Sequence, residues 1–257
     1  MDTITWADET VRADLQAVRD KTPFIYGLTN FVAANLSANA LLALGAGPAF
    51  GAAPGWTGAF PMGAGAMFIN GASLMSSATP ADLVEAAATA AAAGTPWVLD
   101  PVAMGAGAPA YDAVITSLLA SGPAIIRGNA SEVAALAGAA GGASGVDSTL
   151  DSSEVVDLVA ELATRLGAVV AVSGATDYIS DGTRTVAVPG GSELMPRVTG
   201  TGCSLGAVNA AFAAVTNPFD AAVAAHVAYA EAGARAGART SGPGSFAVAF
   251  IDELAAL

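Results

Sequence analysis

Short apolar runs of three to five residues alternate with longer alanine-rich segments along almost the whole chain. The short runs predict strands at Phe24–Leu28, Met67–Asn70, Trp97–Leu99, Ala124–Arg127 and Val169–Ser173. The longer segments predict helices at Val32–Leu44, Ala81–Ala93, Ala110–Ala120, Ser131–Ala137, Ser153–Leu166, Cys203–Val215, Pro218–Ala236 and Phe246–Leu254. Strands and helices that alternate in this way are joined by crossovers. We therefore expect an α/β fold with a mostly parallel central sheet and helices on both faces.

A hairpin-like piece stands out late in the chain. Tyr178–Ser180 and Thr183–Val188 flank the turn residues Asp181 and Gly182, which indicates antiparallel strands. The Gly-Ala-rich piece Gly138–Ser144 is interpreted as a loop. There is no internal repeat, and 257 residues suffice for one large core, so we expect one domain over residues 1–257.

The apolar fraction of 54% raises the question of a membrane protein. No charged residue occurs from Thr22 to Ala81, but prolines and glycines interrupt this stretch. It lacks the run of about 20 strongly apolar residues that a spanning helix needs. Residues 1–20 are polar and acidic, without the basic start and apolar core of a signal peptide. We expect no membrane segment.

The charge and the cysteine content narrow the class further. A net charge of −13 argues against a nucleic-acid surface. Cys203 is the only cysteine, which excludes an intrachain disulfide and is compatible with a reducing cytoplasm. An acidic protein that binds a polyanion such as ATP needs local help from backbone dipoles, a metal ion or a placed arginine.

Polar residues follow the predicted strands. They are Thr29 and Asn30, Asn70, Asp100 and Pro101, Arg127 to Asn129, and Ser173 and Gly174. Ligands of open α/β sheets bind beyond the carboxyl ends of the strands. Because these residues end otherwise apolar segments, they predict a binding site at that edge.

The segment Val198–Cys203 contains two glycines and leads directly into an apolar helix. Glycines let the backbone aim several N–H groups at one point, and the helix start adds its positive end. Gly200, Thr201 and Gly202 thus predict an anion hole for a transferred phosphate. Cys203 would lie at the helix start, where the pKa of a thiol is lowered, and would accept or orient an alcohol proton. A helix entry with a buried cysteine is an equally good interpretation.

Arg127 is the only basic residue between Lys21 and Arg165, and it ends an apolar strand. A guanidinium group matches phosphate oxygens, so Arg127 is a candidate phosphate clamp. Glu132 is a candidate for holding Mg²⁺ through waters. Taken alone, Asn129 and Glu132 fit a helix capping box better, since they have its spacing.

Two further residues have open interpretations. Asp100 either binds a metal-water shell or steadies a neighbouring cation, and it can equally cap the next turn. Asn30 is foremost a helix N-cap, with a substrate role as the minority interpretation.

The Gly-rich turn Ser241–Phe246 is best explained as a helix entry, and His226 as a packed histidine. One His and one Cys exclude a zinc-type site, and a single lysine, Lys21, excludes a P-loop.

Six segments in register resemble hydroxyethylthiazole kinase, a family of thiamine salvage within the ribokinase-like superfamily. They are Leu28–Val32, Ala38–Ala46, Val98–Val102, Ile126–Glu132, Val198–Cys203 and Gly242–Phe246. The resemblance implies phosphorylation of the hydroxyl of 4-methyl-5-(2-hydroxyethyl)thiazole by ATP with Mg²⁺. It also implies a homotrimer with substrate sites near subunit boundaries.

The same resemblance implies roles for single residues. Cys203 takes the place of the aspartate base of other ribokinase-like kinases. Arg127 and Ser173 would contact ATP, and Asp100 and Glu132 would organise Mg²⁺. The thiazole would lie against Gly200, with Asn30 close by and Phe50 in the place of a family methionine.

The chain departs from the family pattern around the acceptor. It has Tyr26 and Gly27 where the family commonly has His-Cys, and Phe50 where the family has Met. Asn70–Leu74 and Ala103–Gly107 also differ from the usual text. The phosphate and metal parts are retained, so the reaction is better specified than the acceptor alcohol. A kinase for another small alcohol, an ATP-dependent NAD(P)H-hydrate dehydratase and a non-catalytic sensor are the alternatives. A cysteine at position 203 argues against the dehydratase, and the retained reacting-centre residues argue against a sensor.

Overall fold

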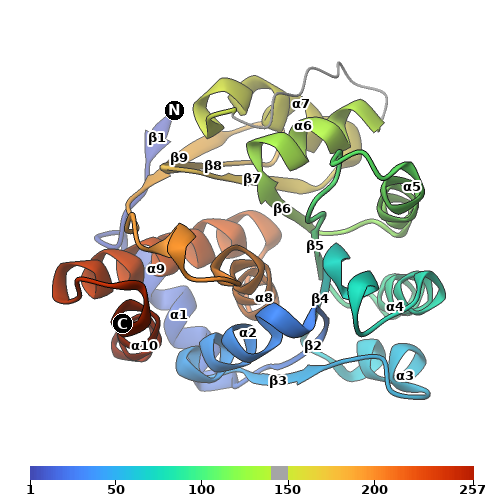
Figure 1. The fold of residues 1–257 in the computed structure, drawn as a ribbon, viewed down its shortest axis with the longest axis horizontal. Coiled ribbons are helices and arrows are strands. Elements are labelled where there is room, and N and C mark those ends of the chain that lie inside the picture. The colour runs from blue at the N-terminus through green and yellow to red at the C-terminus, as the bar shows by residue number, and fades with distance from the viewer. Residues whose placement is uncertain (140–149) are drawn as a thin grey trace.

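The computed structural model describes residues 1–139 and 150–257 of the chain. Within these residues, nine strands form one sheet in the order β1-β9-β8-β7-β6-β5-β4-β2-β3 (Figure 1). The strands are β1 (Asp2–Thr3), β2 (Phe24–Leu28), β3 (Gly47–Phe50), β4 (Ala66–Asn70), β5 (Trp97–Asp100), β6 (Ile125–Asn129), β7 (Val169–Ser173), β8 (Thr176–Ser180) and β9 (Thr185–Pro189). β8 runs antiparallel to β7 and β9, and the other neighbouring pairs are parallel. The predicted mostly parallel sheet and the late hairpin are confirmed.

Helices cover both faces of the sheet (Figure 1). One face packs against α1 (Glu9–Lys21), α2 (Phe31–Leu44), α8 (Thr201–Ala213), α9 (Pro218–Arg239) and α10 (Pro243–Ala256). The other packs against α3 (Trp56–Gly63), α4 (Pro80–Ala93), α5 (Pro109–Leu118), α6 (Ala130–Ala139) and α7 (Val156–Leu166). Successive side chains of a strand enter opposite layers, as in β4, where Phe68 joins the first core and Met67 and Ile69 the second. The central strands β4 and β5 are largely apolar because both of their faces are buried.

Two α-helices and two strands lie outside the predicted set. α1 is amphipathic and buries Val11, Leu15 and Val18, and α3 is short and contains an internal proline. β1 has two residues, and β3 is an edge strand, where Pro48 is tolerated because one side needs no partner. Of the predicted loop Gly138–Ser144, Gly138 and Ala139 belong to α6, and residues 140–144 lie outside the described part.

The carboxyl ends of the parallel strands carry the starts of several helices, which places backbone N–H groups at one edge of the sheet. Asn30 is the N-cap of α2, and its side chain accepts a hydrogen bond from the Ala33 N–H. Gly200 precedes α8 with φ of +89°, a left-handed conformation that favours glycine. The predicted N-cap role of Asn30 is thus present in the structure.

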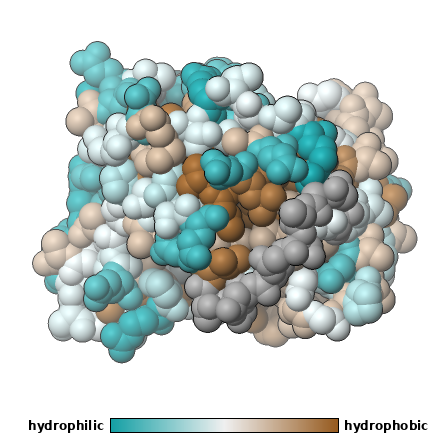
Figure 2. Space-filling view, turned by 90° about the horizontal axis from the view of Figure 1, so that it is seen from above, coloured by the Kyte–Doolittle hydropathy of each residue, from teal (hydrophilic) through white to brown (hydrophobic). Residues whose placement is uncertain are grey.

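One face of the molecule exposes apolar residues. Seen from above relative to Figure 1, apolar residues gather in the middle of the face and polar ones surround them (Figure 2). Among the described residues, no helix combines the length and the apolar character needed to cross a membrane.

Candidate active site

Polar side chains at the ends of adjacent strands form a continuous series of contacts. Asn70 lies opposite Asp100 in the register of β4 and β5. The Asn30 amide donates to Asn70 Oδ1 (3.1 Å), and the Asn70 amide donates to Asp100 Oδ2 (3.1 Å). Arg127 Nη1 lies 3.5 Å from the same Asp100 oxygen. The carboxyl ends of adjacent strands therefore bring together residues that are up to about a hundred positions apart in the chain, as the sequence predicted.

Asp100 is the buried centre of this series, with 0% of its surface exposed. Burial raises the pKa of its carboxyl to about 7, against the opposing effect of Arg127. The negative charge of Glu132 contributes to this rise of the pKa. Oδ1 of Asp100 has no hydrogen-bond partner within the described residues. A buried carboxylate oxygen left open in this way is suited to a cation or to a water bound to one.

Arg127 extends along the end of β6 and is held from two sides. Its Nε and Nη2 donate to Ser173 Oγ at 3.1 and 2.8 Å, and Asp100 lies at the other side. Burial alone would lower the pKa of Arg127, but the charges of Asp100 and Glu132 outweigh it and raise the pKa. The guanidinium group is therefore charged and fixed in direction, as binding a phosphate requires.

The start of α8 meets this arginine. A Cβ added at Gly202 would lie 3.4 Å from Arg127 Nη1, so the glycine backbone and the guanidinium group share one point. The Thr201 N–H donates to the Val198 carbonyl (3.4 Å), which leaves the N–H groups of Gly202 and Cys203 as the donors of this turn. The residues predicted to form the anion hole thus lie beside the arginine, and the Thr201 N–H is already engaged.

Cys203 lies at the same helix start, and Asn30 Nδ2 is 3.8 Å from its sulfur. We expected a lowered thiol pKa from the helix dipole. This expectation is wrong: burial raises the pKa of Cys203, and the nearby charge of Asp100 raises it further. The group is therefore a thiol at neutral pH, which favours orienting an alcohol over removing its proton.

Glu132 has both of its carboxylate oxygens occupied by backbone N–H groups. Oε1 accepts from Ala103 (2.9 Å), and Oε2 accepts from Asn129 (2.9 Å). The Asn129 side chain accepts in turn from the Glu132 N–H (2.9 Å). This is the reciprocal geometry of a capping box, so the structural interpretation of Glu132 is present in full. It also fixes the loop after Asp100, because Ala103 belongs to that loop.

The donor set fits a magnesium ion that keeps most of its waters. Asp100 offers the free oxygen Oδ1, and Glu132 adds a second negative charge nearby. In the described residues, no group of three or more His, Cys, Asp or Glu side chains converges on one point. Two carboxylates with phosphate oxygens and waters are a common way to hold Mg²⁺, which rarely has an all-protein cage.

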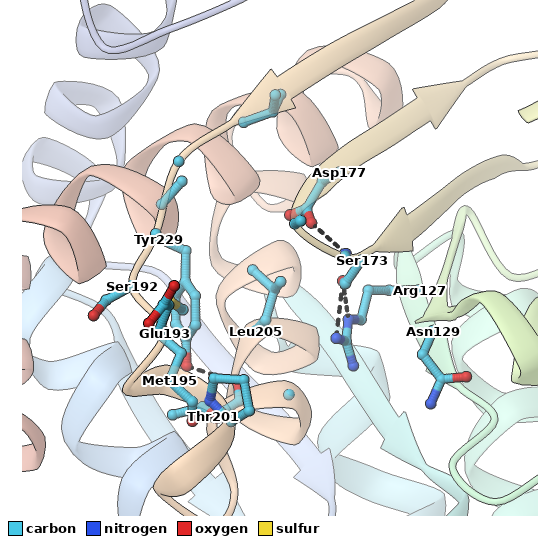
Figure 3. Close-up of a pocket in the computed structure, with 18 residues that line it drawn as sticks. Arg127, Asn129, Ser173, Asp177, Ser192, Glu193, Met195, Thr201, Leu205 and Tyr229 are labelled. Atoms are coloured by element: carbon cyan, nitrogen blue, oxygen red, sulfur yellow. Dashed lines mark hydrogen bonds between the residues drawn. The ribbon is translucent and has the colours of Figure 1, made fainter. Parts of the chain in front are cut away.

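A cavity of about 690 Å³ opens beside Arg127 and the start of α8 (Figure 3). Its residues come from the ends of β6, β7 and β9, the start of β8, the segment after β9, and α8 and α9. They are Arg127, Asn129, Ser173, Gly174, Ala175, Asp177, Val188, Gly190, Gly191, Ser192, Glu193, Met195, Pro196, Thr201, Gly202, Leu205, Tyr229 and Ala230. Arg127, Ser173 and Asp177 lie on one side of the cavity (Figure 3). The other side combines apolar and polar residues, with Met195 and Leu205 beside Ser192, Glu193, Thr201 and Tyr229. A cavity of this volume with a cation on one side can hold a nucleotide.

Phe50 does not line this cavity. It ends β3 opposite Gly27 of β2, and a Cβ added at Gly27 would lie 2.7 Å from its ring. The two departures from the family pattern are thus physically coupled, because only glycine at position 27 leaves room for the ring of Phe50. Phe50 packs partly against the core instead of pointing away from the sheet.

Three residues with contacts in the site were given no individual role from the sequence. Asn70 ended a predicted strand, so its position was visible, but its link between Asn30 and Asp100 depends on the strand order. Asp177 lies at the start of β8, which runs antiparallel to β7. Because of this direction, the first residues of β8 lie at the same sheet edge as the last residues of the parallel strands, where the cavity is. The Tyr229 hydroxyl donates to the Thr201 carbonyl (2.8 Å) from the middle of α9, where no sequence signal marks it.

The comparisons with known proteins now decide the family. A family model described as the hydroxyethylthiazole kinase family matches residues 15–257. A hydroxyethylthiazole kinase of Burkholderia pseudomallei is 54% identical over 258 residues, covering 100% of this chain and 93% of the relative. One from Leptospira borgpetersenii is 42% identical over 253 residues, covering 98% and 95%. The chain belongs to the hydroxyethylthiazole kinase family.

Solved structures agree with this assignment. A hydroxyethylthiazole kinase protein from Pyrococcus horikoshii is 37% identical and superposes with a TM-score of 0.89, covering 97% of this chain and 94% of that one. Pyridoxal kinase of Bacillus subtilis in complex with ADP has a TM-score of 0.59 at 16% identity, covering 81% and 90%. This second likeness concerns the fold alone. The predicted ribokinase-like fold and the family resemblance are both confirmed.

Proposed function

We propose that the protein transfers the γ-phosphoryl group of ATP to the hydroxyl of 4-methyl-5-(2-hydroxyethyl)thiazole. The family assignment supports a kinase. The observation that carries the proposal is the meeting of Gly202 and Arg127, because it places a helix start and a fixed cation at one point. Cys203 directly follows Gly202. This supports a position for the acceptor hydroxyl directly beside the transferred phosphate.

In the proposed reaction, the alcohol oxygen attacks the γ-phosphorus while the bond to the β-phosphate breaks and ADP leaves. The N–H groups of Gly202 and Cys203 stabilise the charge on the transferred group, and Arg127 and Ser173 bind the phosphates. Asn30 and the Cys203 thiol orient the hydroxyl. Because such transition states are loose, the alcohol proton leaves late, to an oxygen of the transferred phosphoryl group, and alignment contributes more than a base does.

Asp100, through its free Oδ1, and Glu132 would hold Mg²⁺ with its waters, and the cation would neutralise charge on the phosphates. The free oxygen of Asp100 and the neighbouring charge of Glu132 support this place. Both carboxylates also hold protein groups: Asp100 contacts Asn70 and Arg127, and Glu132 fixes the backbone of Ala103. Their removal would therefore disturb the arginine and the loop as well as the cation.

We further propose one kinase domain over residues 1–257, a homotrimeric assembly and a cytoplasmic location. Exposed apolar side chains beside the acceptor residues support an assembly: Phe31 and Met75 are 72% and 78% exposed. Phe31 directly follows Asn30, so a second subunit at this surface would border the acceptor site. The single free cysteine is compatible with a reducing compartment.

The test is an ADP-release assay with ATP, Mg²⁺ and a panel of small primary alcohols of the thiazole, pyrimidine and sugar types. We expect the thiazole alcohol to give the highest kcat/KM and a phosphorylated product. Preference for another alcohol would retain the kinase activity and reject the thiazole as the substrate. Phe50 and Gly27, which pack together and depart from the family pattern, would then be the first residues to examine. ADP release with hydrated NADH and no phosphorylated alcohol would establish the dehydratase alternative. Binding of a ligand without ADP release would establish a sensor.

Two variants separate the proposed roles. Cys203→Ser keeps a small polar group at the helix start, so we expect turnover to fall about tenfold without being abolished. Arg127→Ala removes a charge-assisted phosphate contact, and we expect KM for ATP to rise at least about tenfold. Steady-state kinetics with each substrate varied in turn measures both effects. Unchanged kinetics in both variants would defeat the assignments.

A further inference from the structure

His226 is a buried histidine that the proposed reaction does not use. It lies in the middle of α9, with 0% of its surface exposed, among alanines and valines of the core. Its Nδ1 lies 2.6 Å from Asp177 Oδ2, and its Nε2 has no partner within the described residues. Burying a polar nitrogen without a partner costs stability, so packing alone would favour an apolar side chain here.

Asp177 connects this histidine to the nucleotide cavity. The carboxylate lines the cavity on the same wall as Ser173 and Arg127 (Figure 3). Its Oδ1 accepts a hydrogen bond from the Gly174 N–H (2.8 Å), and its Oδ2 faces His226. An ionised carboxylate only accepts, so Nδ1 of His226 donates. Both oxygens are therefore held by protein donors.

The turn that Asp177 holds is the one that directs the arginine. Ser173 precedes Gly174, and the Ser173 hydroxyl accepts two hydrogen bonds from Arg127. This turn has little freedom on its other side, because a Cβ at Gly174 would lie 2.2 Å from Ser152 Oγ. The contacts run from His226 through Asp177 and Gly174 to Ser173 and Arg127.

The charge of Asp177 gives the histidine a second effect. The carboxylate is close enough to Arg127 for its charge to act on the guanidinium group. A free carboxylate in the cavity would compete with ATP phosphates for this arginine and repel them. The hydrogen bonds from the Gly174 N–H and from His226 hold the Asp177 carboxylate against the turn, so that it does not compete with the ATP phosphates for Arg127.

We propose that His226 is a positioning residue for nucleotide binding, acting through Asp177 on the Ser173-Gly174 turn and thereby on Arg127. The inference rests on the proposed use of ATP. It concerns the nucleotide alone, because His226 Nδ1 contacts the cavity-lining Asp177, whereas the acceptor residues Asn30 and Cys203 contact each other. Removing the His226 donor should therefore change KM for ATP and leave KM for the alcohol unchanged.

The test compares His226→Leu, which removes the donor, with His226→Asn, whose amide nitrogen takes the place of Nδ1. We expect His226→Leu to raise KM for ATP about tenfold, as for loss of one hydrogen bond to a charged group, with kcat and KM for the alcohol within about twofold. His226→Asn should restore KM for ATP to within about threefold of the wild type. If the Leu variant does not fold, His226→Gln, with its amide at the place of Nε2, replaces it.

Val227→Ala is the matched control, because Val227 is the next buried residue of α9 and packs into the core. It should lower the unfolding free energy and leave KM for ATP unchanged. Equal KM values in the wild type and His226→Leu would overturn the inference. So would a parallel rise of both KM values, or an equal rise in Val227→Ala. Failure of the wild type to bind ATP would instead reject the proposed function, and isothermal titration with ATP separates the two cases.

Discussion

At the scale of single residues, Asp100 combines full burial with a negative charge beside Arg127. Its position was predictable, because a carboxylate after an apolar strand lies at the ligand edge of an α/β sheet. Its pKa was not, since it depends on burial and on Arg127 and Glu132 from other elements. The same reason explains the wrong expectation for Cys203: the helix start was visible in the sequence, but the burial of the thiol and the distance to Asp100 were not.

The raised pKa of Asp100 predicts a pH-dependent stability of the metal-free protein. Between the ordinary value of 3.8 and about 7, the native carboxyl keeps a proton that the unfolded chain has lost. The native state binds more protons, so the unfolding free energy falls as the pH rises through this window. Asp100→Asn lacks this contribution. We expect the stability difference, wild type minus variant, to fall by at most about 4 kcal/mol from pH 4 to pH 8.

Urea unfolding in EDTA at several pH values measures this difference. Addition of Mg²⁺ should recover part of the loss in the wild type at pH 8, because the cation stabilises the ionised carboxylate, and should have no such effect on Asp100→Asn. A stability difference that does not vary with pH would show that Asp100 titrates as an ordinary carboxyl.

At the scale of elements, the start of α8 determines where the phosphate can bind. Gly200 has φ of +89°, and a Cβ there would lie 3.2 Å from the Ala33 backbone in α2. We expect Gly200→Ala to strain this turn and shift the N–H groups of Gly202 and Cys203, lowering kcat at least about tenfold with a smaller change in KM for ATP. Single-turnover kinetics measures the chemical step. Wild-type kcat in a folded Gly200→Ala protein would contradict this prediction.

Helix ends also contain a site of local strain that is remote from the cavity. Thr22 ends α1 with φ of 41°, a conformation that costs a β-branched residue energy, while its N–H donates to the Val18 carbonyl. Thr22→Gly relieves the strain and should raise the unfolding free energy by about 1 kcal/mol, with activity unchanged. Thr22→Ala, which keeps the Cβ, is the control. Denaturant unfolding of the two variants should separate them.

The predicted and observed elements differ where the apolar signal is weak. Long runs such as Phe24–Leu28 and Val169–Ser173 matched their strands because both faces are buried. β3 was missed because it contains a glycine and a proline and acts as an edge strand, a role that only the neighbouring β2 defines. Asp177 was missed for a related reason, since the direction of β8 had to be known before its first residues could be placed at the site.

At the scale of the whole molecule, the net charge of −13 confines anion binding to places where the backbone and arginine provide positive potential. Arg127 and the start of α8 are such a place, and they lie on the cavity side of the sheet edge. The other side of this edge has a different surface. It carries the start of α2, with Phe31 and Val32 exposed by 72% and 49%.

This apolar surface leads to a prediction about assembly. The Phe31 N–H donates to Ser76 Oγ (3.2 Å), which ties the start of α2 to the segment that carries the exposed Met75. We expect these side chains to be covered by another copy of the chain, because large apolar groups gathered in one region are unfavourable in water.

Phe31→Asp should therefore convert trimers to monomers and, since Asn30 is adjacent, raise KM for the alcohol about tenfold with little change in KM for ATP. Size-exclusion chromatography with light scattering and two-substrate kinetics test this together. Val84→Asp, at an exposed apolar residue of α4 on the opposite layer, is the control and should stay trimeric. A monomeric wild type, or a trimeric Phe31→Asp variant, would show that this surface has another use.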